Sequence, residues 1–273
     1  MKQVLIVGAG HHFPKGPFTF LNTMNSQERV HAKGLFFRPV DYCALAAVSR
    51  VASMTPLLDL EDNEKEVIAV NKSLFSHQCE DHYIPYSIHD NDREWDKDLF
   101  RKESRFADLI LISQELFYAE TDNGQPNQYL REALHSAECP VLLVPENFTT
   151  VQHLFMAYDG SRDSVHALKQ FCYLFPDLTD LPTEILYINE KAGDSMPDID
   201  SLKQFTRVKF NCMSFSKLQL NAPDYFATWI SEKKDALLVS GSFGRSPVSY
   251  IGNRSFSEEV IHEHHLPIFI AHR

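Results

Sequence analysis

The hydrophobic positions along the second half of the chain fall into short, almost unbroken runs bounded by turn residues. Amphipathic stretches of helical length separate these runs, and this alternation predicts a parallel sheet whose strands are connected by crossover helices. Continuous apolar runs are typical of strands that helices cover on both faces. The five predicted strands are residues 153–161, 184–189, 214–220, 235–241 and 267–272.

The first half repeats this pattern with the same number and order of runs. Residues at the ends of the last two runs share one offset of 127 between the halves, and a shared offset indicates a tandem repeat. The matching runs are residues 3–10, 32–40, 83–89, 108–113 and 140–146. The three pairs with this offset are Asp108 and Asp235 (235 − 108), Ser113 and Ser240 (240 − 113), and Pro140 and Pro267 (267 − 140).

The two copies predict two domains, residues 1–148 and 149–273, with the boundary in the polar stretch 147–152. The expected fold class is α/β, with two tandem open sheets, each of them parallel and covered by helices on both faces. The first copy is longer in its middle, where residues 57–82 and 94–106 have the spacing of amphipathic packing helices.

Composition narrows the function classes. The formal net charge is −11, from 26 basic and 37 acidic residues, and the basic residues do not cluster along the sequence, which argues against a nucleic-acid or anionic-membrane surface. Five widely spaced cysteines indicate neither a disulfide framework nor a zinc site. No apolar run is long enough for a signal peptide or a membrane span, so we expect a cytoplasmic protein.

The first strand of the second copy ends in Asp159-Gly160-Ser161. An Asp at the carboxyl end of the first strand faces the crevice where open α/β sheets bind ligands, and Ser161 or Asp163 can cap the helix that follows. Asp159 is equally well explained as a residue that only shapes the turn. The sequence leaves both interpretations open.

The fourth strand of the second copy leads into a glycine-rich loop and then a helix start. Gly241 and Gly244 allow the backbone to come close to phosphate oxygens, and Ser255 forms a capping box with Glu258. The free N–H groups of residues 255–257 and the helix dipole favour an anion. The same pattern also suits an ordinary turn before a capped helix.

Together these motifs resemble the universal stress protein (UspA) family. The resemblance rests on three features: a first strand that ends in Asp-Gly-Ser, a fourth strand that leads into G-x2-G-x9-G-[ST], and a tail, SFSEEVIHEHHLPIFIAH, that is similar to the family's last helix and strand. The resemblance covers the second copy end to end and extends to the first through the repeat. It implies five-stranded parallel sheets of order 3-2-1-4-5 that pack through their last strands, which gives an internal pseudo-dimer. Whether two chains also form a homodimer is left open.

Some members of this family bind ATP, and the resemblance implies where a nucleotide with Mg²⁺ would lie. Asp159 and the main chain near Ile188 would flank the adenosine. The stretch that would hold the ribose and phosphates contains Gly241, Gly244, Arg254, Ser255, Phe256 and Ser257.

Two departures from the family pattern affect this expectation. Arg254 stands where the motif has its third glycine, while Gly252 lies two residues early, so that Arg254 either blocks the site or supplies a cation to an anionic ligand. In the first copy the offset of 127 maps Gly241 onto Gln114, and Gly244 and Ser255 onto Phe117 and Gln128, which leaves no glycine cradle. We expect the first copy to be structural or to bind a ligand other than ATP.

Other signals carry less weight. The stretch GAGHHF at residues 8–13 departs from the dinucleotide fingerprint at Phe13, no P-loop motif is present, and His262, His264 and His265 suit a helix C-terminus better than a metal site. No catalytic residues are identifiable. The leading hypothesis is a non-enzymatic stress-response protein that binds a nucleotide in its second copy only; the alternatives are a slow nucleotide-hydrolysing enzyme using Asp159 with Mg²⁺, and a scaffold with both sites closed.

Overall fold

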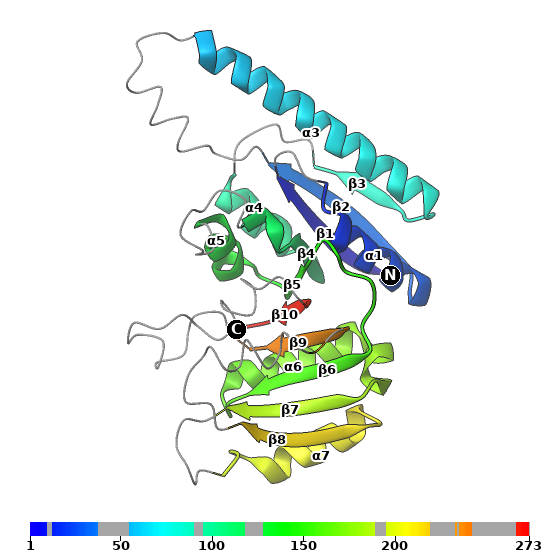
Figure 1. Ribbon diagram of the computed structural model, residues 1–273, viewed down its shortest axis with the longest axis vertical. Coiled ribbons are helices and arrows are strands. Elements are labelled where there is room, and N and C mark those ends of the chain that lie inside the picture. Colours follow the sequence, from blue (N-terminus) through cyan, green and yellow to red (C-terminus); the bar gives the residue numbers. More distant parts are fainter. Residues whose placement is uncertain are drawn as a thin grey trace.

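The computed structural model describes residues 1–9, 13–37, 55–89, 95–117, 128–188, 195–218, 233, 235–241 and 266–272. Strands and helices alternate along the first half of the chain and, in the second half, up to residue 218 (Figure 1). The first half contains β1 Lys2–Ala9, α1 Lys15–Gln27, β2 Val30–Phe37, α3 Thr55–Asp81, β3 Tyr86–Ile88, α4 Lys97–Ser104, β4 Leu109–Ser113, the 3-10 helix η1 Glu115–Phe117, α5 Gln128–Ser136 and β5 Val141–Val144. The second half contains β6 His153–Tyr158, α6 Arg162–Leu174, the 3-10 helix η2 Pro176–Asp180, β7 Thr183–Ile188, α7 Ile199–Lys209, β8 Met213–Leu218, β9 Ala236–Ser240 and β10 Ile268–Ile270.

The described strands form one sheet in the order β3-β2-β1-β4-β5-β10-β9-β6-β7-β8. Each half has the order 3-2-1-4-5, and every pair within a half is parallel. The predicted fold class is therefore confirmed. Predicted and observed strand ends differ by up to three residues, since a strand ends where its ladder of hydrogen bonds stops and the hydrophobic pattern does not mark that residue.

The two halves are joined by their last strands. β5 and β10 pair antiparallel, with Leu143 opposite Ile268 and Val141 opposite Ile270. Figure 1 shows β10, in red, between β5 and β9 at the middle of the sheet. This pairing satisfies the backbone of two strands that would otherwise be sheet edges. The pairing forms the internal pseudo-dimer that the resemblance implies.

Helices cover both faces of the sheet. Alternate residues of each strand point to opposite faces, and in β1 Val4 and Ile6 join one buried cluster while Leu5 and Val7 join another. The first cluster takes side chains from α1, α3, α6 and α7, and the second takes side chains from α4 and α5. Both clusters contain residues of both halves, so the apolar core is continuous across the β5–β10 junction.

Two further contacts join the halves on the face that carries α1 and α6. The ring of Phe20 in α1 packs against Phe175 of the second half, with ring centroids 5.7 Å apart, and also against Phe148 of its own half, at 5.3 Å. The ammonium of Lys2 donates to the carbonyl of Leu174, at 2.7 Å, and pairs with Glu28. A cation at the C-terminus of α6 is favourable because the last carbonyls of a helix carry partial negative charge.

The register of the strands corrects the offset of 127. The N–H of Ile110 in β4 donates to Pro140 O, and the N–H of Leu238 in β9 donates to Pro267 O. If the two prolines correspond, Ile110 corresponds to Leu238, which is an offset of 128 (238 − 110). Hydrogen bonding and side-chain direction set strand register, so matching residue types at strand ends do not identify equivalent positions. The structural counterpart of Gly241 is therefore Ser113, the residue before Gln114.

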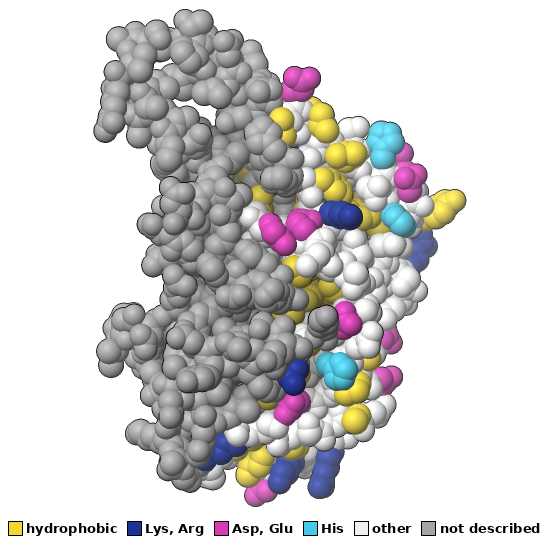
Figure 2. Space-filling model, in the orientation of Figure 1, with side chains coloured by type: hydrophobic (Ala, Val, Ile, Leu, Met, Phe, Trp, Pro, Cys, Tyr) yellow, Lys and Arg dark blue, Asp and Glu magenta, His cyan; other side chains and the backbone are white. Residues whose placement is uncertain are grey.

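Charged side chains of both signs are interspersed over the described part of the face in Figure 2. This distribution agrees with the dispersed charges expected from the sequence. None of the described helices combines the length and the apolar character that crossing a bilayer requires.

Candidate functional site

The turn after β6 is held by its own side chains. The Ser161 N–H donates to Asp159 Oδ1, at 2.8 Å, and the Ser161 hydroxyl oxygen accepts from the N–H of Ser164, at 3.1 Å. Ser161 is therefore the N-cap of α6, one of the two caps expected. The side chain of Asp159 is exposed, so the same carboxylate can shape the turn and still face solvent at the end of β6.

Gly160 in this turn has a φ of +81°, and a Cβ on it would lie 2.7 Å from the Cβ of Pro197. Both the backbone conformation and the space therefore favour glycine. This approach places Pro197, just before α7, at the end of β6.

Tyr158 also contacts Pro197, through a hydrogen bond from its side chain. Its hydroxyl donates to the carbonyl of Pro197, at 3.0 Å, and its side chain is buried. Burial raises the pKa of Tyr158, and the nearby charges of Asp198 and Asp159 raise it further. Tyr158 thus stays protonated and can donate its hydrogen bond. Tyr187 lies beside it in register on β7.

Gly241 follows β9 and is buried against the first turn of α6. A Cβ at this position would lie 2.3 Å from the Asp163 carbonyl carbon and from the Ser164 nitrogen. Only glycine permits this approach without a shift of backbone. Gly241 thus brings bare backbone against a helix of the same half. Its predicted approach to phosphate oxygens stays a prediction.

Three of the predicted site residues come together at one edge of the sheet. Asp159 follows β6, Ile188 ends β7 and Gly241 follows β9, and these three strands are neighbours with β6 in the middle. The carboxyl ends of parallel strands meet at one edge, and the chain connections diverge on the two sides of β6, as they do at ligand crevices of open α/β sheets.

The other predicted positions of this site are Gly244, Arg254, Ser255, Phe256 and Ser257, and they lie outside the described residues. The predicted phosphate-binding part and the role of Arg254 therefore stay predictions. Tyr158, Tyr187 and Pro197 were not singled out from the sequence. A Tyr directly before Asp-Gly-Ser is a visible signal, whereas the approach of Pro197 depends on a loop that returns 39 residues later.

The first half has different chemistry at the corresponding edge. The side chain of Gln114 is fully buried and its amide nitrogen donates to Leu266 O in the second half, at 2.7 Å. Among the described residues, Gln114 Oε1 has no hydrogen-bond partner. The Ser113 hydroxyl donates to Glu115 Oε2, at 3.2 Å. The side chains of Phe117 and Gln128, the other two mapped positions, are outside the described set.

No protein-family model matches the chain, and no curated protein matches its sequence. Its structure is nevertheless similar to solved structures. The crystal structure of a universal stress protein from Archaeoglobus fulgidus DSM 4304 matches 99% of this chain and 96% of its own, with a TM-score of 0.68 and 14% identity. The chain has the universal stress protein fold.

A second structure with this fold supports the same conclusion. A protein from Pseudomonas aeruginosa UCBPP-PA14 that is assigned to the universal stress proteins matches 100% of this chain and 93% of its own, with a TM-score of 0.52 and 14% identity. Because both matches span nearly the whole of each chain, the universal stress protein fold covers both halves. The resemblance to universal stress proteins that the Asp-Gly-Ser turn and the glycine loop indicate thus agrees with the fold.

Proposed function

We propose that the chain is a cytoplasmic stress-response protein of the universal stress protein type, which binds an adenine nucleotide in its second half as a ligand or switch. The observation that carries this proposal is the meeting of Asp159, Ile188 and Gly241 around β6, within the universal stress protein fold. These are the positions at which the resemblance places the adenosine and the start of the phosphate loop.

The surroundings of Asp159 suit such a ligand. Its side chain is exposed, one of its oxygens is held by the Ser161 N–H, and Tyr158 and Pro197 fix the loop beside it. A carboxylate with one oxygen in a turn keeps lone pairs for ribose or amino-group donors. Such a preorganised acceptor loses little conformational entropy when a ligand arrives.

Calorimetric titration of the full chain with ATP and Mg²⁺ tests the proposal. We expect binding by the wild-type protein, weakened about tenfold or more in Asp159→Ala because a hydrogen bond to a charged group is lost. Asp177→Ala is the matched control, since it removes an exposed carboxylate in η2, beyond the C-terminal end of α6. An unchanged affinity in Asp159→Ala would remove Asp159 from the site.

The variant Arg254→Gly decides between the two roles of Arg254. Weaker binding in this variant means that Arg254 supplies a cation to the phosphates. Binding by the variant alone means that Arg254 blocks the site. Absence of binding by both proteins contradicts the nucleotide proposal.

We also propose that the nucleotide is not a substrate. Asp159 is the candidate for orienting a metal or a water, and the sequence identifies no general base or nucleophile to act with it. A phosphate-release assay with ATP and Mg²⁺ is expected to show no turnover above the background without protein. Turnover that disappears in Asp159→Ala would favour the slow enzyme instead.

A further inference from the structure

The residue directly before α7 has an unusual backbone conformation. Asp198 is the N-cap of α7 and has a φ of +48°, in the left-handed region that favours glycine. Its carbonyl oxygen accepts from the N–H of Leu202, at 2.9 Å, but its carboxylate does not cap the helix. Asp198 is also exposed. The helix therefore begins at Asp198 without using the carboxylate of this residue.

A buried hydroxyl from β6 anchors the turn in front of α7. Tyr158 is 3% exposed, and its hydroxyl donates to the carbonyl oxygen of Pro197, the residue directly before Asp198, at 3.0 Å. The ring of Pro197 also lies where a Cβ on Gly160 would stand. Two contacts with the end of β6 thus fix the turn, so β6 determines where the backbone of Asp198 lies.

This anchoring places two acidic residues next to one hydroxyl. Asp159 follows Tyr158 directly, and Asp198 follows the carbonyl to which Tyr158 donates. Burial is the largest cause of the raised pKa of Tyr158, and the charges of Asp198 and Asp159 raise it further. Both acidic residues are exposed. They therefore lie on adjoining segments at the carboxyl end of β6, where the candidate site is.

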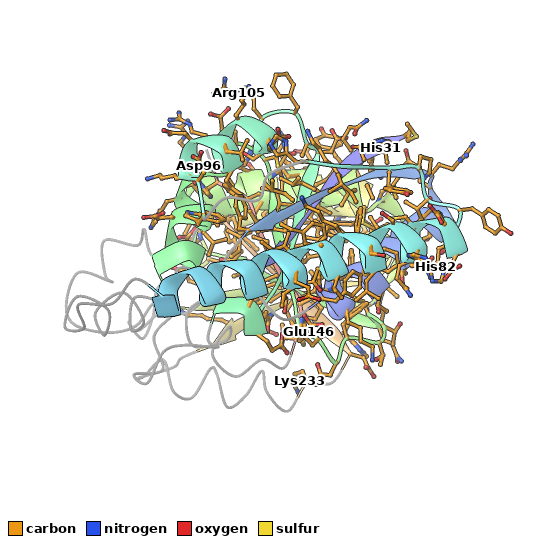
Figure 3. All side chains as sticks on the ribbon, turned by 90° about the horizontal axis from the view of Figure 1, so that it is seen from above. His31, His82, Asp96, Arg105, Glu146 and Lys233 are labelled. Atoms are coloured by element: carbon orange, nitrogen blue, oxygen red, sulfur yellow. The ribbon has the colours of Figure 1, made fainter. Side chains whose placement is uncertain are left out.

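The start of α7 belongs to the helical layer that also contains α1 and α6. Tyr158 is part of the buried cluster of this layer, and Glu146 accepts an N–H of α1 in the same layer. In Figure 3, Asp96 and Arg105 lie on the other side of the sheet from Glu146. Arg105, which is paired with Glu138, is therefore not available to neutralise the two acidic residues at the end of β6.

We propose that Asp198 is a second hydrogen-bond acceptor of the candidate site, that Tyr158 positions it, and that Asp198 and Asp159 together select the nucleoside end of a nucleotide. A carboxylate only accepts hydrogen bonds, so the pair suits the donors of a nucleoside, which are the ribose hydroxyls and the amino group of adenine. The same charges repel phosphates, which directs the triphosphate away from β6 and towards Gly241. This inference rests on the proposed function and adds a residue that contacts the nucleoside.

Calorimetric titration of the full chain with ATP and Mg²⁺ compares Asp198→Gly with Asp200→Ala. Glycine adopts the left-handed conformation without strain, so Asp198→Gly removes the carboxylate and keeps the turn. Asp200→Ala is the matched control, because it removes an exposed carboxylate from the first turn of α7 and changes the net charge equally. We expect binding to weaken about tenfold or more in Asp198→Gly and to keep its wild-type affinity in Asp200→Ala.

The outcomes separate this inference from the proposed function. ATP binding by the wild type with equal affinities of Asp198→Gly and Asp200→Ala overturns the inference and leaves the proposed function intact. If only Arg254→Gly binds ATP, the same comparison is made in that variant. Absence of binding by both the wild type and Arg254→Gly overturns the inference and the proposed function together.

Three analogues of ATP identify the donor that Asp198 accepts from. 2′-DeoxyATP, 3′-deoxyATP and inosine triphosphate lack, in turn, the two ribose hydroxyls and the amino group of the base. We expect the wild type to bind one of them about tenfold more weakly than ATP, and Asp198→Gly to lose most of that preference because the acceptor is gone. A preference that is the same in both proteins for all three analogues contradicts the inference.

The variant Tyr158→Phe tests the positioning role, because it removes only the hydroxyl. We expect it to weaken ATP binding about threefold or more. We also expect no further loss when Tyr158→Phe is added to Asp198→Gly, since the hydroxyl acts through Asp198. A merely structural role of the hydroxyl would weaken binding equally in both backgrounds, so additive losses in the double variant would show that Tyr158 does not position Asp198.

Discussion

At the scale of single residues, the candidate site depends on short approaches that leave no room for a side chain. Gly241 lies against the backbone of Asp163 and Ser164, and Gly160 lies against Pro197 with a positive φ. The glycines and the Asp-Gly-Ser turn were recognisable in the sequence. Their partners were not, because residues 78 positions apart (241 − 163) meet only when the sheet is assembled.

The variant Gly241→Ala tests this close approach. A Cβ 2.3 Å from two backbone atoms of α6 forces β9 and α6 apart, so we expect a loss of about 1–3 kcal/mol in the free energy of unfolding. Urea unfolding followed by circular dichroism measures the change. A stability equal to that of the wild type would mean that β9 and α6 are not in direct backbone contact.

At the scale of elements, α4 shows how much local sequence decides. The amphipathic pattern predicts a helix over residues 94–106, and the observed helix begins after Asp96, whose carboxylate accepts the N–H groups of Asp98 and Leu99. Contacts that tie α4 to the rest of the chain are long-range: Phe100 is buried in the core, and Arg101 and Arg105 both donate to Glu138, which lies between α5 and β5. A helix cap can be predicted from neighbours in sequence, but such an anchor cannot.

The pH dependence of stability tests the anchor of α4. Hydrogen bonds from Arg105 and Arg101 lower the pKa of Glu138 from 4.5 to about 2. A carboxyl group with a lowered pKa stabilises the folded state above its unfolded pKa, and this contribution is lost as the pH falls through the folded pKa. We therefore expect the small stability difference between wild type and Glu138→Gln to be constant above about pH 5 and to shrink towards pH 2. Urea unfolding over this pH range measures it; a difference that grows on acidification would contradict the assignment.

At the scale of the whole molecule, the two halves form one body. They share one sheet through β5 and β10 and one core on each face. Lys2 reaches the end of α6, and Gln114 reaches the carbonyl of Leu266. The predicted boundary at residues 148 and 149 stays a prediction, but the segment from Pro145 to Gln152 does link β5 to β6.

A chain of residues 149–273 alone tests how the halves depend on each other. Removing the first half exposes the edge of β10 and the part of the Phe175 ring that packs against Phe20. Because β5 and β10 pair antiparallel, β10 can pair with a second copy of itself by the same geometry, so we expect a homodimer. Light scattering coupled to size-exclusion chromatography measures the mass. A stable monomer would show that the second half does not need a partner strand.

Local patterns determined the elements. Hydrophobic runs, turn residues and the repeat predicted two five-stranded parallel sheets, the first residues of α6 and the place of Asp159 at the carboxyl end of its strand, whereas the place of Ile188 beside it was implied by the resemblance. These features depend on side-chain periodicity and on turn chemistry, and both are encoded by residues that are close together in sequence. The strand order 3-2-1-4-5 and the pairing through the last strands were implied by the resemblance and then observed.

The tertiary structure alone decided what depends on register and on distance in sequence. The offset of 128 in the fourth strand replaced the offset of 127 because ladder hydrogen bonds align strands, whatever residues stand at their ends. The contact of Glu146 with Gly16, 130 residues away, has no local signal. A carboxylate and a helix start are each ordinary in the sequence, and only the folded sheet places one on the other.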